Sequence, residues 1–158
     1  LALSGVAGRA EILELTIHGG VAFGGSFNGN PIVLAGSDAT LGVLSANDGA
    51  ALKHAHRVGE SIMEGIREAA RRRGLPLLVT GFGTAFAVHF TRKPELIEYR
   101  DTLADDTEML RRLVIALLEE GVYILPDGRL YVSVVHTGED AKEPVAAVDR
   151  ALKEPGTE

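Results

Sequence analysis

The sequence predicts an α+β layer from Gly49 onward, in which a small, mostly antiparallel sheet is covered by helices. Two observations predict it: amphipathic helical patterns alternate with short segments rich in β-branched and aromatic residues, and glycine or proline turn signals separate these segments. With 158 residues, of which 46% are hydrophobic, the chain can build a core without disulfides or a structural metal.

Charge and composition exclude several classes of protein. The 22 acidic residues outnumber the 16 Lys and Arg, and the net charge of −6 argues against a nucleic-acid partner. Cysteine is absent from the sequence, which excludes disulfides, thiolate zinc sites and cysteine nucleophiles. Because no apolar run approaches the roughly 18–20 residues of a membrane span, we expect a soluble, cytoplasmic protein with no membrane partner.

The first residues predict the end of a strand and a short helix. Residues 4–7 are typical of a strand end, and residues 9–15 predict a helix with Ile12, Leu13 and Leu15 on its buried side. The chain begins with neither methionine nor the basic region of a signal peptide. We therefore expect further sequence upstream of it.

Two longer helices are predicted next. Over residues 30–45, an Asn-Pro pair supplies an N-cap and a first-turn proline. Apolar residues surround most of this helix, which predicts that it is buried. Residues 47–49, Asn-Asp-Gly, predict a break, and residues 50–73 predict a second, amphipathic helix that a glycine ends.

The middle of the chain predicts strands and then a helix. Residues 77–91 predict two strands or one bent strand, with the glycines of residues 81–83 as a bulge or turn. Residues 103–120 predict an amphipathic helix. The acidic residues around its start, from Asp101 to Glu108, are interpreted as negative charge near the first turn.

The last part predicts a hairpin and a helix. Residues 122–125 and 130–135 predict its strands, and residues 126–128, Pro-Asp-Gly, predict its turn. A final helix begins at Thr137 or, because proline disfavours a helix interior, one position before Pro144.

A glycine-rich segment is the strongest functional signal that the residues themselves give. Residues 19–29 hold five glycines directly before a predicted helix N-terminus, and Ser26 adds a hydroxyl donor. Free backbone N–H groups and the helix dipole favour an anion there. No lysine follows Gly29, so the segment is not a nucleotide P-loop, and a purely structural turn is the alternative.

The histidines predict no metal site. His54 and His56 are two apart on a predicted helix, and thus on nearly opposite faces, so we interpret them as solvated. His89 and His136 are interpreted as structural, with hydrogen bonds to backbone or carboxylate groups. Arg129, beside a glycine turn, is a candidate for binding a carboxylate, with a solvated arginine as the alternative.

Several motifs resemble one enzyme family. Residues 24–31, GGSFNGNP, resemble a segment of class III pyridoxal-phosphate aminotransferases and glutamate-1-semialdehyde aminomutases. Further matches follow in family order and span most of the chain: VAGR at 6–9, GTAF at 83–86, HFT at 89–91, GVY at 121–123, VS at 132–133 and HT at 136–137.

The resemblance implies an α/β and α+β fold, as the C-terminal part of a fold-type I enzyme that uses pyridoxal 5'-phosphate. Residues 1–47 would end the large cofactor domain, and residues 48–158 would form the small domain. The lysine that forms a Schiff base with the cofactor is expected upstream of Leu1, so no catalytic residue is expected here and the fragment alone should be inactive. The Gly25 amide and the Ser26 hydroxyl would bind the cofactor phosphate of the neighbouring subunit, in a homodimer with its active site at the subunit interface.

The resemblance also implies transfer of an amino group between an amino acid or amine and a keto or aldehyde acceptor. Residues 126–131 are shorter than the corresponding segment of family aminomutases and present an arginine. This favours an aminotransferase, with Arg129 facing a substrate carboxylate. Glutamate-1-semialdehyde 2,1-aminomutase is the alternative, and a non-catalytic module that binds a phosphorylated ligand or dimerises is the second alternative.

Overall fold

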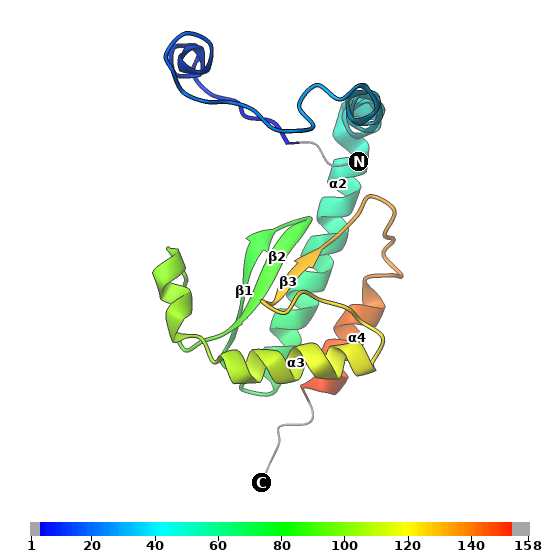
Figure 1. Ribbon diagram of the computed structural model, residues 1–158. Helices are drawn as coiled ribbons and strands as arrows, with labels where there is room; N and C mark the ends of the chain where they lie inside the picture. The colour runs from blue at the N-terminus through cyan, green and yellow to red at the C-terminus, as the bar shows by residue number, and fades with distance from the viewer. Residues whose placement is uncertain (1–3, 153–158) are drawn as a thin grey trace. The chain divides into compact units, whose positions relative to one another are not determined.

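The computed structural model describes residues 4–152, and the chain divides into two compact units, Leu1–Ala50 (unit 1) and Ala51–Glu158 (unit 2). Figure 1 labels the main elements. In chain order the elements are α1 (Ala10–Leu13), η1 (Glu14–Thr16), α2 (Pro31–Arg72), β1 (Leu77–Phe82), β2 (Ala85–Phe90), η2 (Tyr99–Ala104), α3 (Thr107–Glu119), β3 (Arg129–Tyr131) and α4 (Lys142–Ala151).

Unit 1 begins without a strand. Residues 4–9 form no regular element, so the predicted strand end is wrong; a strand needs a hydrogen-bonded neighbour, and the described part of unit 1 contains none. The short helix predicted over residues 9–15 is confirmed as α1 and η1. Its apolar side is not buried as predicted, since Ile12 is 55% exposed and Leu15 47% exposed.

The start of α2 confirms the predicted N-cap. The Asn30 side-chain oxygen Oδ1 accepts hydrogen bonds from the backbone N–H groups of Ile32 at 3.1 Å and Val33 at 3.2 Å. Pro31 is the first helical residue, where its missing N–H group costs nothing. Two of the otherwise unpaired donors of the first turn are thus satisfied within the chain.

The helix predicted over residues 30–45 is confirmed as the first section of α2, but it is not buried as predicted. Ile32, Leu41 and Val43 are between 59% and 70% exposed. The described part of unit 1 holds only α1, η1, connecting loops and this section of α2, so it provides no second layer to cover these side chains.

The predicted break at residues 47–49 is confirmed. Ala46 is extended, with φ −57° and ψ 146°, whereas Asn47, Asp48 and Gly49 have φ values of 51°, 56° and 71°. Glycine, asparagine and aspartate tolerate this left-handed conformation better than other residues do. The sequence Asn-Asp-Gly therefore ends one helical section of α2 and allows the next to begin.

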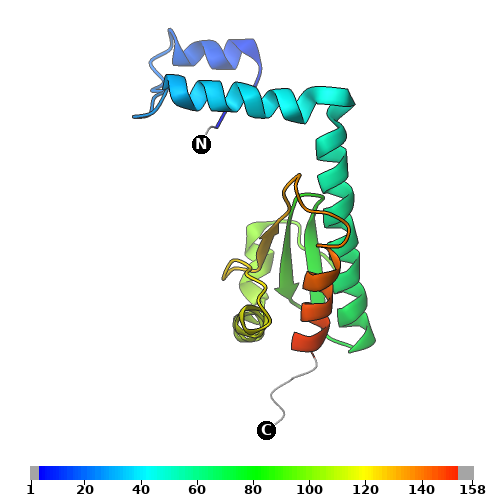
Figure 2. The same cartoon turned by 90° about the vertical axis from the view of Figure 1, so that its right-hand side faces the viewer.

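Unit 2 contains an antiparallel sheet of strand order β1-β2-β3. Residues 77–91 form two strands joined by a turn at residues 83–84, which resolves the alternative of one bent strand. Val79 pairs with Val88, and Phe86 with Leu130. These side chains point to the buried face of the sheet, which packs on the second section of α2 (Figures 1 and 2).

The turn predicted at residues 126–128 is confirmed, with the Gly128 N–H group donating to the Leu125 carbonyl at 2.9 Å, but the two-stranded hairpin predicted from residues 122–125 and 130–135 is wrong. Residues 122–125 form no strand, and β3 pairs with β2 instead. The pairing extends to the turn before β3, where the Val88 N–H group donates to the Gly128 carbonyl at 3.0 Å. The sequence pattern predicted residues 122–125 as the partner of β3. The edge of β2, which is distant in sequence, takes that place instead.

The helix predicted over residues 103–120 begins later, as α3. The Asp106 carboxylate caps it by accepting a hydrogen bond from the Met109 N–H group at 2.9 Å. Of the acidic residues assigned to the first turn, Glu108 lies there, whereas Asp101 belongs to the preceding 3₁₀ helix η2.

The final helix, α4, begins at Lys142, so that Pro144 falls in its first turn. This confirms the later of the two predicted starts. Before it, the Asp140 carboxylate accepts hydrogen bonds from the Thr137 N–H group at 2.7 Å and the Thr137 hydroxyl at 2.8 Å. The Thr-x-x-Asp pattern thus stabilises the turn that leads into the helix.

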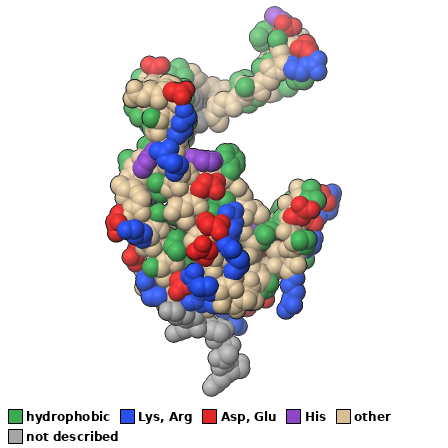
Figure 3. All heavy atoms as spheres, turned by 180° about the vertical axis from the view of Figure 1, so that it is seen from behind, with side chains coloured by type: hydrophobic (Ala, Val, Ile, Leu, Met, Phe, Trp, Pro, Cys, Tyr) green, Lys and Arg blue, Asp and Glu red, His purple; other side chains and the backbone are tan. Residues whose placement is uncertain are grey.

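The core of unit 2 joins α2, the sheet, α3 and α4. Asp149 of α4 binds Arg72 at 2.9 Å and Arg73 at 2.5 Å, which ties α4 to the end of α2. On the face of this unit that Figure 3 shows, acidic and basic side chains alternate. The buried core residues are Val58, Ile62, Met63, Ile66, Ala69, Val79, Phe86, Val88, Phe90, Leu113, Leu117, Ile124, Ala141, Ala147, Val148 and Leu152.

Candidate functional site

The glycine-rich segment of unit 1 folds into a turn directly before α2. The Asn28 N–H group donates to the Gly25 carbonyl at 3.0 Å, and the Asn30 N–H group donates to the Phe27 carbonyl at 3.1 Å. Gly29 has a φ of +72°, which glycine adopts without strain. A Cβ atom at position 25 would lie 3.0 Å from the Asn28 side-chain oxygen and crowd it, so glycine suits this turn.

This turn leaves hydrogen-bond donors unoccupied. The Ser26 hydroxyl and the backbone N–H groups of Gly25 and Ser26 make no hydrogen bond with a described residue, and both residues are exposed. The Asn30 side chain, in contrast, already occupies two N–H groups of the first turn of α2. An anion would therefore bind to the donors of the loop and not to those of the first turn of α2. Residues 19–29 contain no acidic side chain that would repel it.

Arg129 is engaged within the chain. Its Nε donates to the Asp127 carboxylate at 2.7 Å, and its Nη1 donates to the Tyr131 hydroxyl at 3.3 Å. The Asp127 carboxylate raises the pKa of Arg129, and the Arg129 guanidinium lowers the pKa of Asp127. Because the Arg129 side chain is 53% exposed, a ligand carboxylate can reach it, but it would compete with Asp127.

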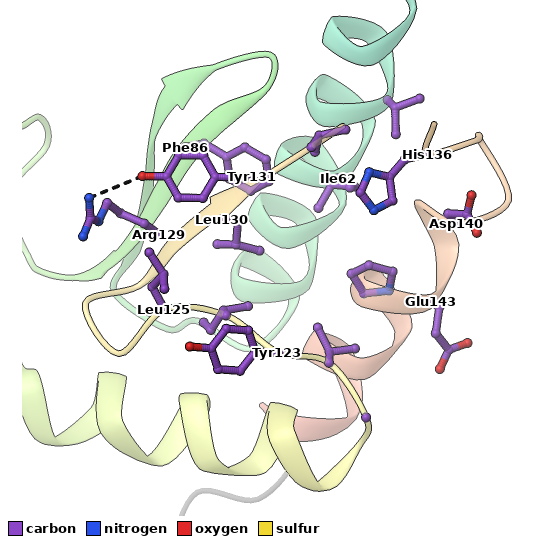
Figure 4. A pocket seen from close by; sticks show the side chains of 16 residues that line it. Ile62, Phe86, Tyr123, Leu125, Arg129, Leu130, Tyr131, His136, Asp140 and Glu143 are labelled. Carbon is purple, nitrogen blue, oxygen red and sulfur yellow. Dashed lines mark hydrogen bonds between the residues drawn. The ribbon is translucent and has the colours of Figure 1, made fainter. Parts of the chain in front are cut away.

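Arg129 also lines a cavity of about 460 Å³ in unit 2 (Figure 4). Val58 and Ile62 of α2, Phe86 of β2 and Leu130 of β3 give it apolar walls. Polar groups come from two further regions: Tyr123 lies on the segment after α3, and His136 and Asp140 lie before α4, whose first turn holds Glu143. The cavity brings together segments far apart in sequence.

Sequence reasoning missed this cavity. Of its residues, Tyr123 and His136 belong to the motifs GVY and HT that resemble the family, and the sequence predicts only a structural hydrogen bond for His136. That bond is confirmed: His136 Nδ1 accepts from the Ser133 N–H group at 2.8 Å. The only signal for a shared site was that these motifs, together with Arg129, follow one another at the end of the chain.

Two other histidines, His89 and His54, have hydrogen-bond partners in the structure. His89 lies 2.8 Å from an Asp105 carboxylate oxygen through Nδ1 and 3.1 Å from the Thr80 hydroxyl through Nε2, which confirms the predicted structural role. The other Asp105 oxygen is buried and has no hydrogen-bond partner. The prediction that His54 is solvated is wrong, because its Nε2 lies 2.7 Å from the His136 carbonyl.

Neither a metal cluster nor a membrane-spanning helix is present in the described range, residues 4–152. No three His, Cys, Asp or Glu side chains of that range gather in a way that could hold a metal ion. Within the same residues, every helix is too short or too polar to cross a membrane.

Sequence comparison connects this chain with one enzyme family. A glutamate-1-semialdehyde 2,1-aminomutase from Thermus thermophilus is 32% identical over 149 residues, which are 92% of this chain and 34% of that protein. No family model matches the chain. The chain thus spans about a third of the length of the curated relatives it matches.

Structure comparison agrees with the sequence. A β-phenylalanine aminotransferase from Variovorax paradoxus superposes with a TM-score of 0.75 at 28% identity, over 92% of this chain and 34% of that one. An omega-transaminase from Sphaerobacter thermophilus gives a TM-score of 0.74 at 23% identity over the same shares, and shows the fold alone. The predicted family resemblance and the mixed α/β fold are confirmed.

Proposed function

We propose that this chain is the C-terminal part of a pyridoxal-phosphate-dependent class III aminotransferase, which transfers an amino group between an amino acid or amine and a keto or aldehyde acceptor. The observation that carries this proposal is the loop at Gly25 and Ser26, where unoccupied donors precede a capped helix. The relatives that share the fold are transaminases and aminomutases. Residues 1–47 then end the large cofactor domain, and residues 48–158 form the small domain.

The loop fits the phosphate group of the cofactor. The Gly25 N–H group and the Ser26 hydroxyl would hold it through charge-assisted hydrogen bonds, and no acidic side chain of the loop opposes its charge. When bound, pyridoxal 5'-phosphate supplies an electron sink for the reaction, and the role of these residues is to bind and orient it.

The phosphate donors would serve the neighbouring subunit of a homodimer, whose active site lies at the subunit interface. The exposed apolar side chains of unit 1, among them Phe23, Phe27 and Leu41, support a partner for this unit. We assign no catalytic residue to this chain, and the lysine that forms a Schiff base with the cofactor is proposed to lie upstream of Leu1. The chain alone would then be inactive.

Arg129 is proposed to face a substrate carboxylate, after exchanging Asp127 for it. Its exposed guanidinium at the edge of the cavity supports this role. Arginine binds carboxylates with two parallel hydrogen bonds, which would fix the orientation of an amino acid substrate.

Glutamate-1-semialdehyde 2,1-aminomutase is the second candidate function. The 32% identical Thermus thermophilus protein carries this name, and this observation favours it. The two activities differ in whether the amino group leaves for a second molecule, so a direct assay separates them.

The test uses the full-length protein that contains this chain. After incubation with pyridoxal 5'-phosphate and dialysis, a retained absorption band in the near-visible range is expected. An aminotransferase will then transfer the amino group of alanine or 1-phenylethylamine to a 2-keto acid, whereas an aminomutase will convert glutamate-1-semialdehyde without an added acceptor. A colourless protein that acts on none of these compounds would refute both functions.

A further inference from the structure

Arg129 and Tyr131 lie on the same face of β3. Side chains alternate along a strand, so Leu130 packs against the core of unit 2, whereas the two flanking residues are exposed. Pairing with β2 places Arg129 opposite Ala87 and Tyr131 opposite Ala85. The backbone of the sheet therefore fixes the positions from which both side chains extend.

The two side chains meet at the edge of the cavity. Arg129 Nη1 donates a hydrogen bond to the Tyr131 hydroxyl oxygen at 3.3 Å, and both residues line the cavity (Figure 4). A hydroxyl that accepts a hydrogen bond can still donate its own proton, and no described residue accepts a hydrogen bond from this one. A cation and an available O–H donor thus lie side by side.

Asp127 holds the guanidinium in an exposed ion pair. Its Oδ2 lies 2.7 Å from both Nε and Nη2 of Arg129. The Asp127 side chain is 55% exposed, and an ion pair in water contributes little to stability. After an exchange, water solvates the Asp127 carboxylate, and its Oδ1 keeps the Arg129 backbone N–H group at 3.4 Å. An incoming carboxylate can therefore replace Asp127 at small cost.

From this geometry we infer that Tyr131 is a substrate-binding residue that forms, together with Arg129, a clamp for one carboxylate group. A carboxylate offers about four lone-pair sites, so it accepts from the guanidinium and from the Tyr131 hydroxyl at once. The hydrogen bond between the two side chains keeps their donors together. The inference rests on the proposed function and deepens it, because the clamp selects amino acid substrates over amines that lack a carboxylate.

The first experiment measures binding without turnover. Isothermal titration calorimetry compares 3-phenylpropionate with its uncharged amide, 3-phenylpropanamide, on the full-length protein. The carboxylate should bind at least about ten-fold more tightly than the amide. Tyr131→Phe keeps the ring and should weaken the carboxylate about five-fold, as expected for one hydrogen bond to a charged group, while the amide changes by less than about two-fold. The control Tyr99→Phe, on the exposed helix η2, should alter neither ligand.

Equal losses for both ligands in Tyr131→Phe, or no loss for the carboxylate, would overturn the inference. Two further variants test how the clamp works. Asp127→Asn should tighten the carboxylate about three-fold, because the amide no longer competes for the guanidinium, and unchanged or weaker binding would contradict the exchange. In an Arg129→Gln background, Tyr131→Phe should change the affinity by less than about two-fold. A full five-fold loss there would show that the two residues do not share one carboxylate.

Retention of pyridoxal 5'-phosphate is measured separately on the same proteins. A full-length protein that binds 3-phenylpropionate through Arg129 and Tyr131 but retains no cofactor would refute the proposed function and support the clamp. A protein that retains the cofactor and binds the carboxylate equally well in Tyr131→Phe would refute the clamp alone.

Discussion

The two units share one helix, α2, but differ in what surrounds it. In unit 1, Leu41 is 59% exposed, whereas Ile66, on the second section of the same helix, is fully buried in unit 2. Unit 1 also leaves the donors of Gly25 and Ser26 unoccupied, while unit 2 satisfies its histidines and most of its charged groups internally. Apolar residues in a helix thus indicate a surface that requires a partner, and the surrounding elements decide whether the chain provides it.

The largest contrast is expected from deleting one leucine side chain in each unit. Leu117→Ala removes a side chain that is 1% exposed in the core of unit 2, and it should lower the free energy of unfolding by about 3–4 kcal/mol. Leu41→Ala should change it by less than about 0.5 kcal/mol. Urea denaturation of the chain measures both, and a similar loss in the two variants would show that unit 1 is covered in solution.

A second contrast compares two helical glycines of α2. An alanine Cβ at Gly59 would lie 1.7 Å from the Gly83 carbonyl oxygen, whereas Gly42 has open space around its Cβ position. Gly59→Ala should therefore cost about 2–3 kcal/mol through displacement of the β1–β2 turn. Gly42→Ala should stabilise the chain by about 0.5–1 kcal/mol, because alanine favours the helix. Equal effects in thermal or urea unfolding would contradict the close approach of α2 and the turn.

The stability of unit 2 should also fall in acid. The Lys93 ammonium, together with the N–H groups of Glu98 and Ile97, lowers the pKa of Asp101 to about 2. A carboxylate whose pKa is lower in the folded than in the unfolded state stabilises the fold above its unfolded pKa. This contribution is lost as the pH falls from about 4 to about 2.

Unfolding measured between pH 6 and pH 2 checks this dependence. Asp101→Asn should flatten part of the acid slope, and Glu119→Gln, which changes an exposed carboxylate outside any described ion pair, should leave the slope unchanged. An identical slope in the native chain and in Asp101→Asn would rule out the contribution of Asp101.

Local signals in the sequence predicted much of the fold. Asn30 and Pro31 marked the start of α2, Asn47 to Gly49 marked its break, and Pro144 marked the start of α4. Each acts through its own backbone or its nearest neighbours, so no tertiary information is needed. The family motif at residues 24–31 likewise led to the loop with unoccupied donors.

Features that depend on distant partners could not be predicted in this way. Residues 122–125 have strand-like composition, but β2 pairs with β3, and this choice is made in three dimensions. The cavity escaped prediction for the same reason, since α2, β2 and the loop at His136 meet only after folding. The glycine turn beside Arg129 indicated this residue as a candidate for binding a carboxylate, but the structure was needed to show that it pairs with Asp127.

The smallest effect is also the most direct test of the account, which holds that the loop at Ser26 binds the cofactor phosphate. Two ligands are compared in the full-length protein: pyridoxal 5'-phosphate, and pyridoxal, which lacks the phosphate. The dissociation constant of each is measured for the native protein, for Ser26→Ala and for the control Ser45→Ala. Ser45 is a suitable control because its hydroxyl donates to the Leu41 carbonyl at 2.7 Å. Ser26→Ala should weaken the phosphorylated ligand about ten-fold and leave pyridoxal unchanged, while Ser45→Ala affects neither. If Ser26→Ala weakens both ligands equally or neither, the phosphate assignment is wrong.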